Sequence, residues 1–354
     1  MPRKVTMEDV ARQSGVSLAT VSLVMRGRPG INDETRQRVL EAARALGYRR
    51  RLPADGQPAH AAQRVGVLIK GRADDAPLAN PFYAPLLAGI ESACRRLRLN
   101  LLFATIPVDL DNHPVEVPRL LEEGDVDGVL LVGAFVDQTI TRLVERRALP
   151  LVLVDAYTEA NYDIVGTDNF RGAYEAVAHL IACGHRRIGL VGTQPDAYPS
   201  LRERRRGYIQ ALADYGIAEP YFGDCRIAQD EELAAAARLL REQPDVTAVF
   251  CSNDHVAVRL YEAAQGLGRR IPDDLSVMGF DNVDLALYLT PPLTTMHVDT
   301  PTLGSIAVET LVRRVETPEA SCRTTLVRPR LVERQSVRTL DADSNIPLPG
   351  SGNL

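Results

Sequence analysis

The sequence predicts an α/β protein that begins with a small helical head, and three observations support this fold class. Residues 1–52 carry the cap and glycine signals of short helices and contain eleven Lys or Arg against five Asp or Glu. From Val65 onward, short apolar runs such as VGVLI, GVLLVG and LPLVLVD occur without polar alternation. Segments with helical spacing of apolar residues separate these runs. Uniformly apolar strands are typical of parallel sheets covered on both faces by helices, so we expect a doubly wound body.

Length and composition exclude several classes of protein. At 354 residues, the chain is long enough for two or three domains. No apolar run could cross a bilayer, and the start MPRKVTMEDV lacks the apolar segment of a signal peptide. The five cysteines are scattered without C-x-x-C spacing, which argues against a disulfide framework or a zinc site. A soluble protein of the reducing cytoplasm is expected.

The net charge of −5 conceals an asymmetry between the two parts of the chain. Residues 53–354 contain 30 Lys or Arg against 41 Asp or Glu, so a basic head precedes an acidic body. Neutralisation of phosphates supplies most of the non-specific affinity of proteins for DNA, and we therefore expect the head to approach a polyanion. On charge alone, a solvated basic face is the alternative.

Three helices are predicted in the head from their caps. Thr6 and Asp9 have the form of a capping box, and Gly15 ends this first helix. Ser17 caps a second helix that runs to Gly27, and a third begins near Asn32 and ends at Gly47. The inward-facing positions are Val10, Ala11, Val21, Val24, Val39, Leu40, Ala43 and Leu46. A helix, a glycine turn and a second helix form the helix-turn-helix arrangement, whose second helix lies in the major groove of DNA.

The first two predicted helices also carry a dense sequence pattern. The pattern T-x-x-D-V-A-x-x-x-G-V-S-x-x-T-V-S is matched by Thr6, Asp9, Val10, Ala11, Gly15, Val16, Ser17, Thr20, Val21 and Ser22. On these residues the head closely resembles that of the LacI/GalR family of bacterial transcription regulators. The resemblance continues to about Gln335, and it implies a two-lobed body similar to a periplasmic sugar-binding protein, with an effector cleft between the lobes and a homodimer that reads a palindromic operator.

The resemblance also implies roles for residues of the head. It places Leu18, Ala19 and Leu23 at base-reading positions and Thr20 and Ser22 at phosphates. The predicted DNA-binding set is Thr6, Ser17, Leu18, Ala19, Thr20, Ser22, Leu23, Arg26, Arg49, Arg50 and Arg51. The family commonly has arginine or another polar residue in place of Leu23, and asparagine in place of Arg26. An apolar side chain contacts a thymine methyl but cannot pair with guanine, so we expect weak guanine preference opposite Leu23.

The linker RRRLPADGQPAHAAQ departs from the family. Relatives carry a hinge helix here that folds on DNA and inserts a leucine into the minor groove. Gly56 and Pro58 leave at most about one helical turn, and the wedge position falls near Gln57, which is not apolar. We expect the three arginines 49–51 to grip phosphates or a narrow minor groove, with Leu52 as the alternative wedge.

In the body, polar residues follow the predicted strands. Ligands of open α/β sheets bind at the carboxyl ends of strands, and carboxylate, amide, guanidinium and aromatic groups there suit a sugar. The predicted effector-binding residues are Asn80, Phe82, Asp155, Arg204, Asn253 and Asp281, of which the last four match family contacts. Structural alternatives remain: a turn and a core aromatic for Asn80 and Phe82, a turn or capping role for Asp155, and an Asx-turn for Asp281. Asp254 is expected to cap the helix that follows it.

The predicted domains are a helix-turn-helix head (1–49), a linker (50–63), a two-lobed effector-binding and dimerisation domain (64–338) split near 155–168, and a disordered tail (339–354). The tail has no apolar heptads, so a tetramer is not expected.

The predicted function is repression of transcription in the bacterial cytoplasm, at the nucleoid, under control of a small effector. A sugar is expected, with a purine-type co-repressor as the alternative. The missing signal peptide and the basic head oppose a solute-binding protein. A glycoside hydrolase using Asp155 and Asp281 is opposed by the missing nucleophile elbow, phosphate loop and dinucleotide motif. No histidine pair has metal-ligand spacing, and no cofactor is expected; His185 is interpreted as structural, while His113, His255 and His297 could border the cleft.

Overall fold

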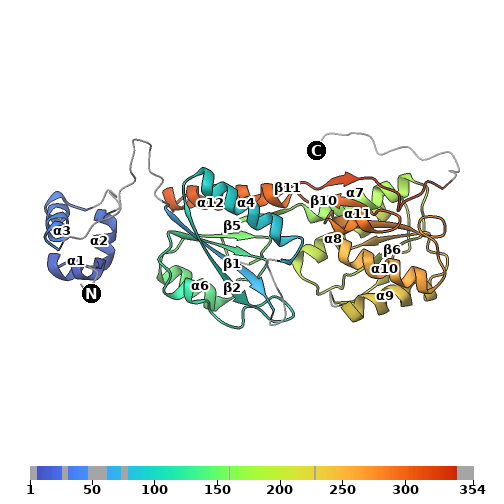
Figure 1. Cartoon of the computed structure of the whole chain (residues 1–354), viewed down its shortest axis with the longest axis horizontal. Helices are drawn as coiled ribbons and strands as arrows, with labels where there is room; N and C mark the ends of the chain where they lie inside the picture. The colour runs from blue at the N-terminus through green and yellow to red at the C-terminus, as the bar shows by residue number, and fades with distance from the viewer. Residues whose placement is uncertain are drawn as a thin grey trace. The chain divides into compact units, whose positions relative to one another are not determined.

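The computed structural model describes residues 6–25, 31–46, 62–72, 79–158, 160–226 and 229–340. Contacts within the chain define two compact units, Met1–Ala61 and Ala62–Leu354, and each is described by itself (Figure 1). Among the described residues, no helix is both long and apolar enough to span a bilayer.

The head consists of α1 (Met7–Ser14), α2 (Leu18–Met25) and α3 (Asp33–Ala45). The predicted capping box is present: Thr6 Oγ1 accepts from the Asp9 N–H at 3.3 Å, and Asp9 Oδ2 accepts from the Thr6 N–H at 3.0 Å. Gly15 ends α1 with φ 68°, and Ser17 Oγ caps α2 by accepting from the Thr20 N–H at 3.1 Å. The sequence thus predicted these helix ends correctly. The predicted ends at Gly27 and Gly47 lie outside the described residues.

Fewer residues of the head are buried than the sequence predicted. Its buried members are Val10, Val21, Val24, Val39, Ala42 and Ala43. Ala11, Leu40 and Leu46 are only partly buried and pack against its edge. Because the buried face of α3 is centred on Val39 and its i+3 and i+4 neighbours, Leu40 lies on the side of that stripe.

The first lobe of the body is built on a six-stranded parallel sheet. Its strands are β1 (Arg64–Gly71), β2 (Asn100–Pro107), β3 (Gly128–Val132), β4 (Leu151–Val154), β5 (Asp163–Thr167) and β11 (Thr324–Val327), in the order β11-β5-β4-β3-β1-β2. Its helices are α4 (Tyr83–Arg96), α5 (Arg119–Glu122), α6 (Gln138–Arg146) and α12 (Thr300–Glu316). Alternate strand residues face the two sides: Leu130 packs in the cluster that contains residues of α4 and α12, and Leu131 packs in the cluster that contains residues of α5 and α6.

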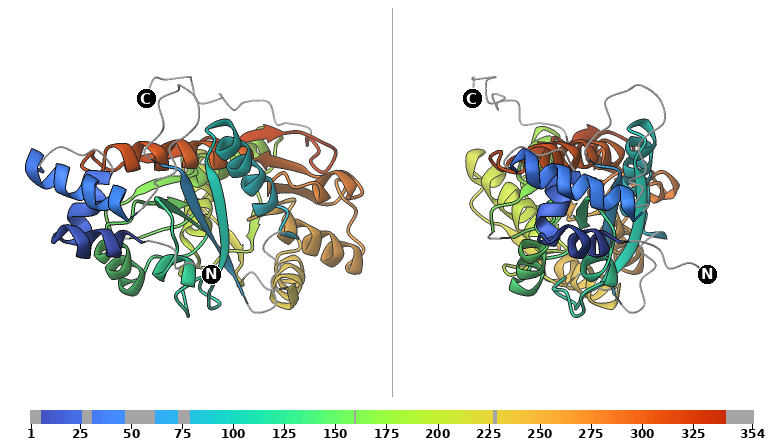
Figure 2. Two further views of the ribbon diagram at one scale, coloured as in Figure 1. Left: turned by 60° about the vertical axis from the view of Figure 1, so that its left-hand side comes forward. Right: turned by 90° about the vertical axis from the view of Figure 1, so that its left-hand side faces the viewer.

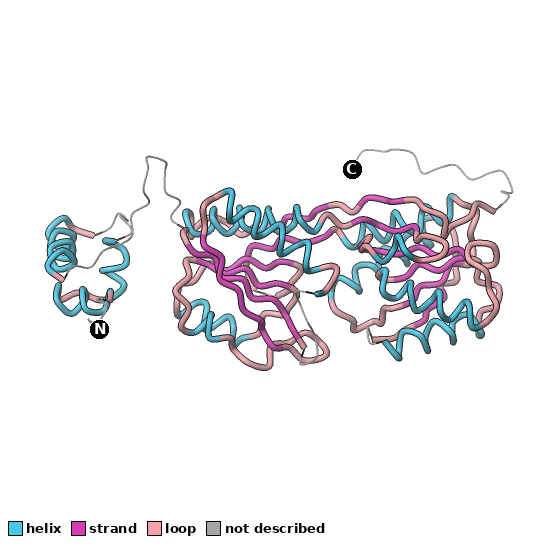
Figure 3. The backbone as a smooth tube through the Cα atoms, viewed as in Figure 1, coloured by secondary structure: helices cyan, strands magenta, loops and turns pink. Residues whose placement is uncertain are grey.

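The second lobe repeats this architecture. Its strands are β6 (Ile188–Val191), β7 (Tyr221–Gly223), β8 (Ala248–Cys251), β9 (Ser276–Asp281), β10 (Thr294–His297) and β12 (Arg330–Val332), in the order β12-β10-β9-β8-β6-β7. Only β12 is antiparallel, to β10. Its helices are α7 (Asn169–Ala182), α8 (Pro199–Asp214), α9 (Gln229–Glu242), α10 (Asp254–Gly266) and α11 (Leu285–Tyr288). Figure 3 shows the two groups of strands in magenta with helices on both of their sides. The predicted doubly wound α/β class is confirmed.

The chain passes between the lobes three times, not once. The crossovers lie at residue 168, at 298–299 and at 328–329, after β5, β10 and β11. The predicted split near 155–168 therefore identifies only the first crossover. The second crossover returns the chain to the first lobe as α12, which lies beside α4 although more than 200 residues separate the two helices (Figure 1 and Figure 2). Gly304 permits this close approach, because a Cβ there would lie 2.3 Å from the Leu86 carbonyl oxygen.

Candidate functional site

Three of the predicted effector residues meet where the carboxyl ends of the strands of both lobes face each other. Asp155 follows β4 in the first lobe, whereas Arg204 of α8 and Asp281 at the end of β9 belong to the second lobe. The charge of Arg204 acts on both carboxylates, and the charge of Asp155 acts on Asp281. Two carboxylates and a guanidinium from different lobes therefore share one electrostatic environment.

Arg204 is the most fully bonded member of this group. Its Nε donates to Asn169 Oδ1 at 2.8 Å, and its Nη2 donates to Asp281 Oδ1 at 3.1 Å. Its Nη1 donates to the carbonyl oxygen of Ser252, and its guanidinium carbon lies 3.8 Å from the ring centroid of Phe280. A buried guanidinium with all three nitrogens bonded is held in one orientation.

The two carboxylates are less acidic than free aspartate. Burial raises the pKa of Asp281 to about 6 against the opposing charge of Arg204. Burial also raises the pKa of Asp155, against the charges of Lys70 and Arg204. Asp155 adopts a left-handed backbone with φ 46°, and its carboxylate accepts from the Tyr83 hydroxyl at 3.4 Å. When ionised, each carboxylate can accept hydrogen bonds from the hydroxyl groups of a ligand, and when protonated it can also donate one.

Aromatic side chains that the sequence analysis did not select surround Asp155. The hydroxyl of Tyr198, at the N-terminus of α8 in the second lobe, donates to the Asp155 carbonyl oxygen at 3.1 Å. Its ring centroid lies 4.9 Å from that of Phe135 and 5.4 Å from that of Tyr157, both in the first lobe. A lobe-bridging aromatic cluster therefore lines one side of the site. Its sequence signal is weak: Tyr157 follows the strand-ending Asp155 by two residues, and Tyr198 precedes a helix-opening proline.

A lysine also belongs to this site. Lys70 near the end of β1 donates from Nζ to Asn112 Oδ1 at 3.1 Å. The same nitrogen lies 5.1 Å from the ring centroid of Tyr198 and 5.6 Å from that of Tyr83. His113 borders the cluster as the sequence allowed, stacked on Phe135 with centroids 4.5 Å apart.

The structure gives the other predicted effector residues local roles. Asn80 is exposed, and its Oδ1 accepts from the backbone N–H groups of Phe82 and Tyr83 at 2.9 and 3.2 Å. Phe82 is half-buried and packs edge-on against Tyr83, with centroids 5.2 Å apart. These contacts are the turn and the core aromatic that the sequence left open as alternatives.

The capping role expected of Asp254 belongs to Asn253. Asn253 caps α10, because its Oδ1 accepts from the Val256 N–H at 2.8 Å. Asp254, expected to be the cap, is 1% exposed and accepts instead from the Thr295 hydroxyl at 2.6 Å and the Val283 N–H at 2.8 Å. The prediction that Asp254 caps the helix was wrong because α10 begins at Asp254 itself, one residue earlier than expected.

The predicted DNA-reading residues lie on the outer face of α2. Val21 and Val24 form the buried inner face of α2, whereas Leu18 and Leu23 are 46% and 41% exposed. Thr6, Ser17 and Ala19 are also exposed, and Thr20 and Ser22 are half-buried. Arg26, Arg49, Arg50 and Arg51 lie outside the described residues. The roles of all these residues in DNA binding, like those of the effector residues, stay predictions.

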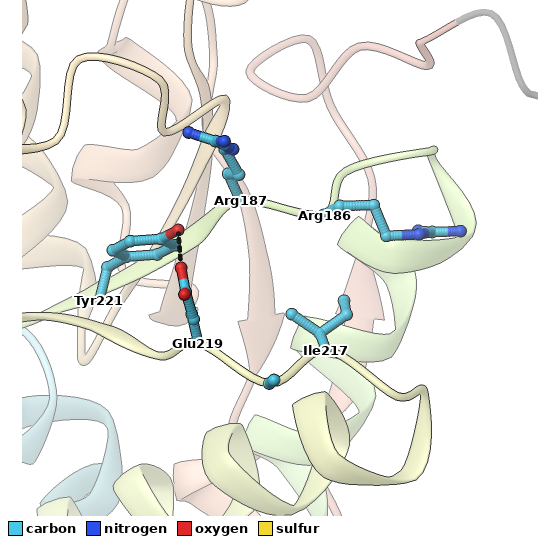
Figure 4. A pocket seen from close by; sticks show the side chains of 6 residues that line it. Arg186, Arg187, Ile217, Glu219 and Tyr221 are labelled. Atoms are coloured by element: carbon cyan, nitrogen blue, oxygen red, sulfur yellow. Dashed lines mark hydrogen bonds between the residues drawn. The ribbon is translucent and has the colours of Figure 1, made fainter.

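A separate pocket of about 280 Å³ lies in the second lobe, near the amino ends of β6 and β7 (Figure 4). It is lined by Arg186, Arg187, Ile217, Ala218, Glu219 and Tyr221. The Tyr221 hydroxyl donates to Glu219 at 3.1 Å, and Arg187 pairs with Asp245. In Figure 4 the Arg186 side chain extends away from Tyr221, so the two arginines do not converge on one point. No predicted residue lies in this pocket.

His185 has the structural role that the sequence indicates. It is fully buried, with Nδ1 2.9 Å from Thr247 Oγ1 and Nε2 3.1 Å from the Arg338 carbonyl oxygen. Burial lowers its pKa to about 4. In the part of the chain that the structure describes, no group of three His, Cys, Asp or Glu residues could hold a metal ion.

Comparisons with known proteins match both parts of the chain. The family model for bacterial regulatory proteins of the lacI family matches residues 6–51, and that for a periplasmic binding protein-like domain matches residues 177–337. The ribose operon repressor of Haemophilus influenzae is 34% identical over 339 residues, which cover 95% of this chain and 99% of that protein. The transcriptional repressor PurR of Photobacterium profundum is 33% identical over 340 residues, with 95% and 99% coverage.

Solved structures show the same likeness. A complex of the transcriptional regulator CelR with cellobiose has a TM-score of 0.66 at 27% identity and covers 94% of this chain and 99% of that one. A LacI family regulator from Enterococcus faecium with bound ribose has a TM-score of 0.67 at 27% identity, with 79% and 100% coverage. The lac repressor dimer bound to operator shares the fold, with a TM-score of 0.64 at 23% identity and 95% and 100% coverage.

Proposed function

The chain belongs to the LacI family of bacterial regulatory proteins, and we propose that a sugar bound between the lobes of its body controls its affinity for an operator. As a LacI-family repressor it is a DNA-binding regulator and not an enzyme. We therefore assign the two carboxylates at the site to ligand binding and not to catalysis.

One observation carries the proposal of an effector site. The charge of Arg204 in the second lobe acts on Asp155 of the first, the charge of Asp155 acts on Asp281, and the Tyr198 hydroxyl donates to the Asp155 carbonyl oxygen across the lobes. Carboxylates accept from sugar hydroxyls, and aromatic rings pack on the apolar face of a pyranose or furanose. A ligand that contacts both lobes favours the arrangement in which those groups are close, which is the differential affinity that allosteric control requires.

Two relatives support a sugar as the effector class, because CelR was solved with cellobiose and the E. faecium regulator with ribose. A purine-type base is the second candidate. PurR is among the sequence relatives, and the rings of Phe135, Tyr157 and Tyr198 could stack on a planar base.

The outer face of α2 is the proposed operator-reading surface, and a homodimer would present two such faces to a palindrome. Apolar side chains are available for self-association on the body. Tyr288 is 79% exposed and Leu287 52%, both on α11, and Phe103 on β2 is 41% exposed. Single exposed apolar residues are ordinary, but two neighbouring ones on a short helix suit a subunit contact.

A three-step experiment tests the proposal. Selection from a random duplex library should yield a palindromic operator for the full-length protein. A thermal-shift screen of sugars, sugar phosphates and nucleobases should then give a compound that raises the melting temperature, since a ligand at 100 times its Kd stabilises by about 2.7 kcal/mol. Fluorescence anisotropy on the selected operator, with and without that compound, measures the coupling. A selection without enrichment, or a ligand that leaves operator affinity unchanged, would refute the proposal.

A further inference from the structure

The turn that follows β9 has an unusual backbone. Asp281 and Asn282 are consecutive residues without glycine, and both have positive φ, at 103° and 57°. Such conformations are disfavoured for residues with a Cβ and persist only where the surroundings hold them. The first of the two carries the carboxylate that pairs with Arg204 at 3.1 Å. The contacts that hold this turn therefore determine the direction of the Asp281 carboxylate.

The side chain of Asn282 is bonded at both ends. Its Oδ1 accepts from Arg334 Nη2 at 2.6 Å, and its Nδ2 donates to His297 Nδ1 at 3.1 Å. The next residue, Val283, donates its N–H to the buried carboxylate of Asp254 at 2.8 Å. Three different segments of the chain thus hold the turn.

Two of these partners lie on segments that follow or precede crossovers between the lobes. His297 is the last residue of β10, directly before the crossover at 298–299, and the Val298 N–H donates to the Asp281 carbonyl oxygen at 3.2 Å. Arg334 follows β12, the strand that begins after the crossover at 328–329, and it also donates from Nη1 to the Leu293 carbonyl oxygen at 2.6 Å. The turn is therefore bonded next to the second connection between the lobes and at the far end of β12, the strand that the third connection leads into.

The remaining crossover is bonded to the other half of the ion pair. Asn169 is the first residue of α7, after the crossover at residue 168, and its Oδ1 accepts from Arg204 Nε at 2.8 Å. The Arg204–Asp281 pair is thus linked through Asn169 and Asn282 to all three connections between the lobes. Neither asparagine was selected by the sequence analysis.

We propose that Asn282 is a positioning residue that aims Asp281 at the effector site and couples that site to the interlobe crossovers through His297 and Arg334. The expected effect of Asn282 on ligand binding rests on the proposed function, whereas its expected effect on the turn does not. A ligand bonded to Asp281 would act through Asn282 on the crossovers and thereby favour one arrangement of the lobes.

Asn282→Gly separates the side-chain bonds from the backbone strain. Glycine adopts positive φ without penalty, so this variant relaxes the backbone and loses only the bonds to His297 and Arg334. Ala148→Gly is the matched control, because Ala148 is an exposed residue with φ 47° that precedes β4, whereas Asp155 of the site follows the other end of that strand. Arg334→Met removes the bond from Arg334 Nη2 to Asn282 Oδ1 and leaves the Asn282 side chain in place.

Hydrogen exchange of the ligand-free, full-length protein reads the turn directly. We expect amides of residues 281–285 and 297–300 to exchange at least about tenfold faster in Asn282→Gly and in Arg334→Met, with β8 and α4 unchanged. Ala148→Gly should exchange as the wild type does at both segments. Unchanged exchange at 297–300, or a uniform rise across the body, would overturn the inference.

Calorimetric titration with D-ribose, cellobiose and hypoxanthine gives the second readout. Asn282→Gly should weaken binding of whichever of them binds the wild type by at least about fivefold, while Ala148→Gly leaves it unchanged. Wild-type affinity retained in Asn282→Gly would overturn the positioning role. If none of the three binds the wild type, these three compounds are excluded as effectors, and the exchange measurement still decides the role of Asn282.

Discussion

Arg204 and Asp281 form a buried ion pair: Nη2 of the arginine donates to Oδ1 of the aspartate at 3.1 Å, and the side chains are 7% and 12% exposed. The pair stays within the second lobe, yet the carboxylate of Asp155 in the first lobe senses the charge of Arg204. A buried pair of this kind contributes little net stability when whole, but breaking it leaves an uncompensated charge in the interior. This asymmetry makes the pair a sensitive place for substitution.

Arg204→Ala should destabilise the body by about 3–5 kcal/mol, because it leaves the Asp281 carboxylate unpaired and the Ser252 and Asn169 acceptors without a donor. It should also abolish the thermal shift caused by the effector. Urea unfolding and the thermal-shift assay measure the two effects. Arg206→Ala is the control: this neighbour on α8 is 67% exposed, and its loss should change stability by less than about 0.5 kcal/mol. Equal losses in the two variants would contradict the buried pair.

Stability should fall as pH rises through the range in which Asp254 titrates. Burial, with the added charge of Asp281, raises the pKa of Asp254 to about 8 from its ordinary value near 4. The folded state therefore favours the protonated acid. The contribution of Asp254 to the free energy of unfolding is fully present below about pH 4, and it is lost as pH rises toward 8, at up to about 1.4 kcal/mol per pH unit.

Asp254→Asn isolates this contribution. The amide keeps an acceptor for the Val283 N–H and can donate to Thr295, but it does not titrate. In urea unfolding at pH 5, 6, 7 and 8, the variant should gain stability relative to the wild type at each step. Parallel pH profiles would show that Asp254 stays ionised throughout.

Leu23→Arg should give the protein a preference for guanine at the operator position that faces residue 23. An arginine on the exposed face of α2 can pair with O6 and N7 of guanine, whereas leucine cannot, and such a contact discriminates by about 1–3 kcal/mol. Binding selections with the wild type and the variant compare base frequencies at the facing position. Leu23→Ala, which shortens the side chain without adding a donor, should not enrich guanine. Strong guanine preference in the wild type would refute the placement of Leu23.

Tyr288→Glu should convert a dimer into monomers, because it buries a charge in the proposed subunit contact. Sedimentation velocity at micromolar concentration measures the change. Ile209→Glu is the control, since Ile209 is also exposed, at 43%, but lies on α8. A dimer that survives Tyr288→Glu would place the subunit contact elsewhere, and a stable wild-type tetramer would contradict the absence of a tetramerising coiled coil.

Replacing Arg49, Arg50 and Arg51 by alanine should flatten the salt dependence of operator binding. Each lost phosphate contact lowers the slope of log K against log salt concentration by about 0.9. Anisotropy titrations at several salt concentrations measure the slope. Leu52→Ala should leave both slope and affinity nearly unchanged; a large loss of affinity in this variant with no change in the arginine variant would restore the leucine wedge.

Local signals predicted the head and the fold class well, and particular residues show why. The capping box of Thr6 and Asp9 and the glycine end at Gly15 involve residues within one helical turn, so the sequence contains the whole interaction. The uniformly apolar runs that became β3, β4 and β8 are buried on both faces, and parallel sheets require that composition. Short or partly polar strands such as β7 and β12 carry no such signal and were missed.

The sequence by itself determined the caps of the head, the alternating strands and helices of the body and, through a family pattern, the candidates Asp155, Arg204 and Asp281. Only the tertiary structure decided which side chains complete the site. Asn253 caps its own helix, while Asp254, Asn282, Lys70 and Tyr198 belong to the network around these candidates. The reason is physical: a cap depends on residues a few positions apart, whereas the site is assembled from strand ends and crossovers that the chain brings together across more than 200 residues.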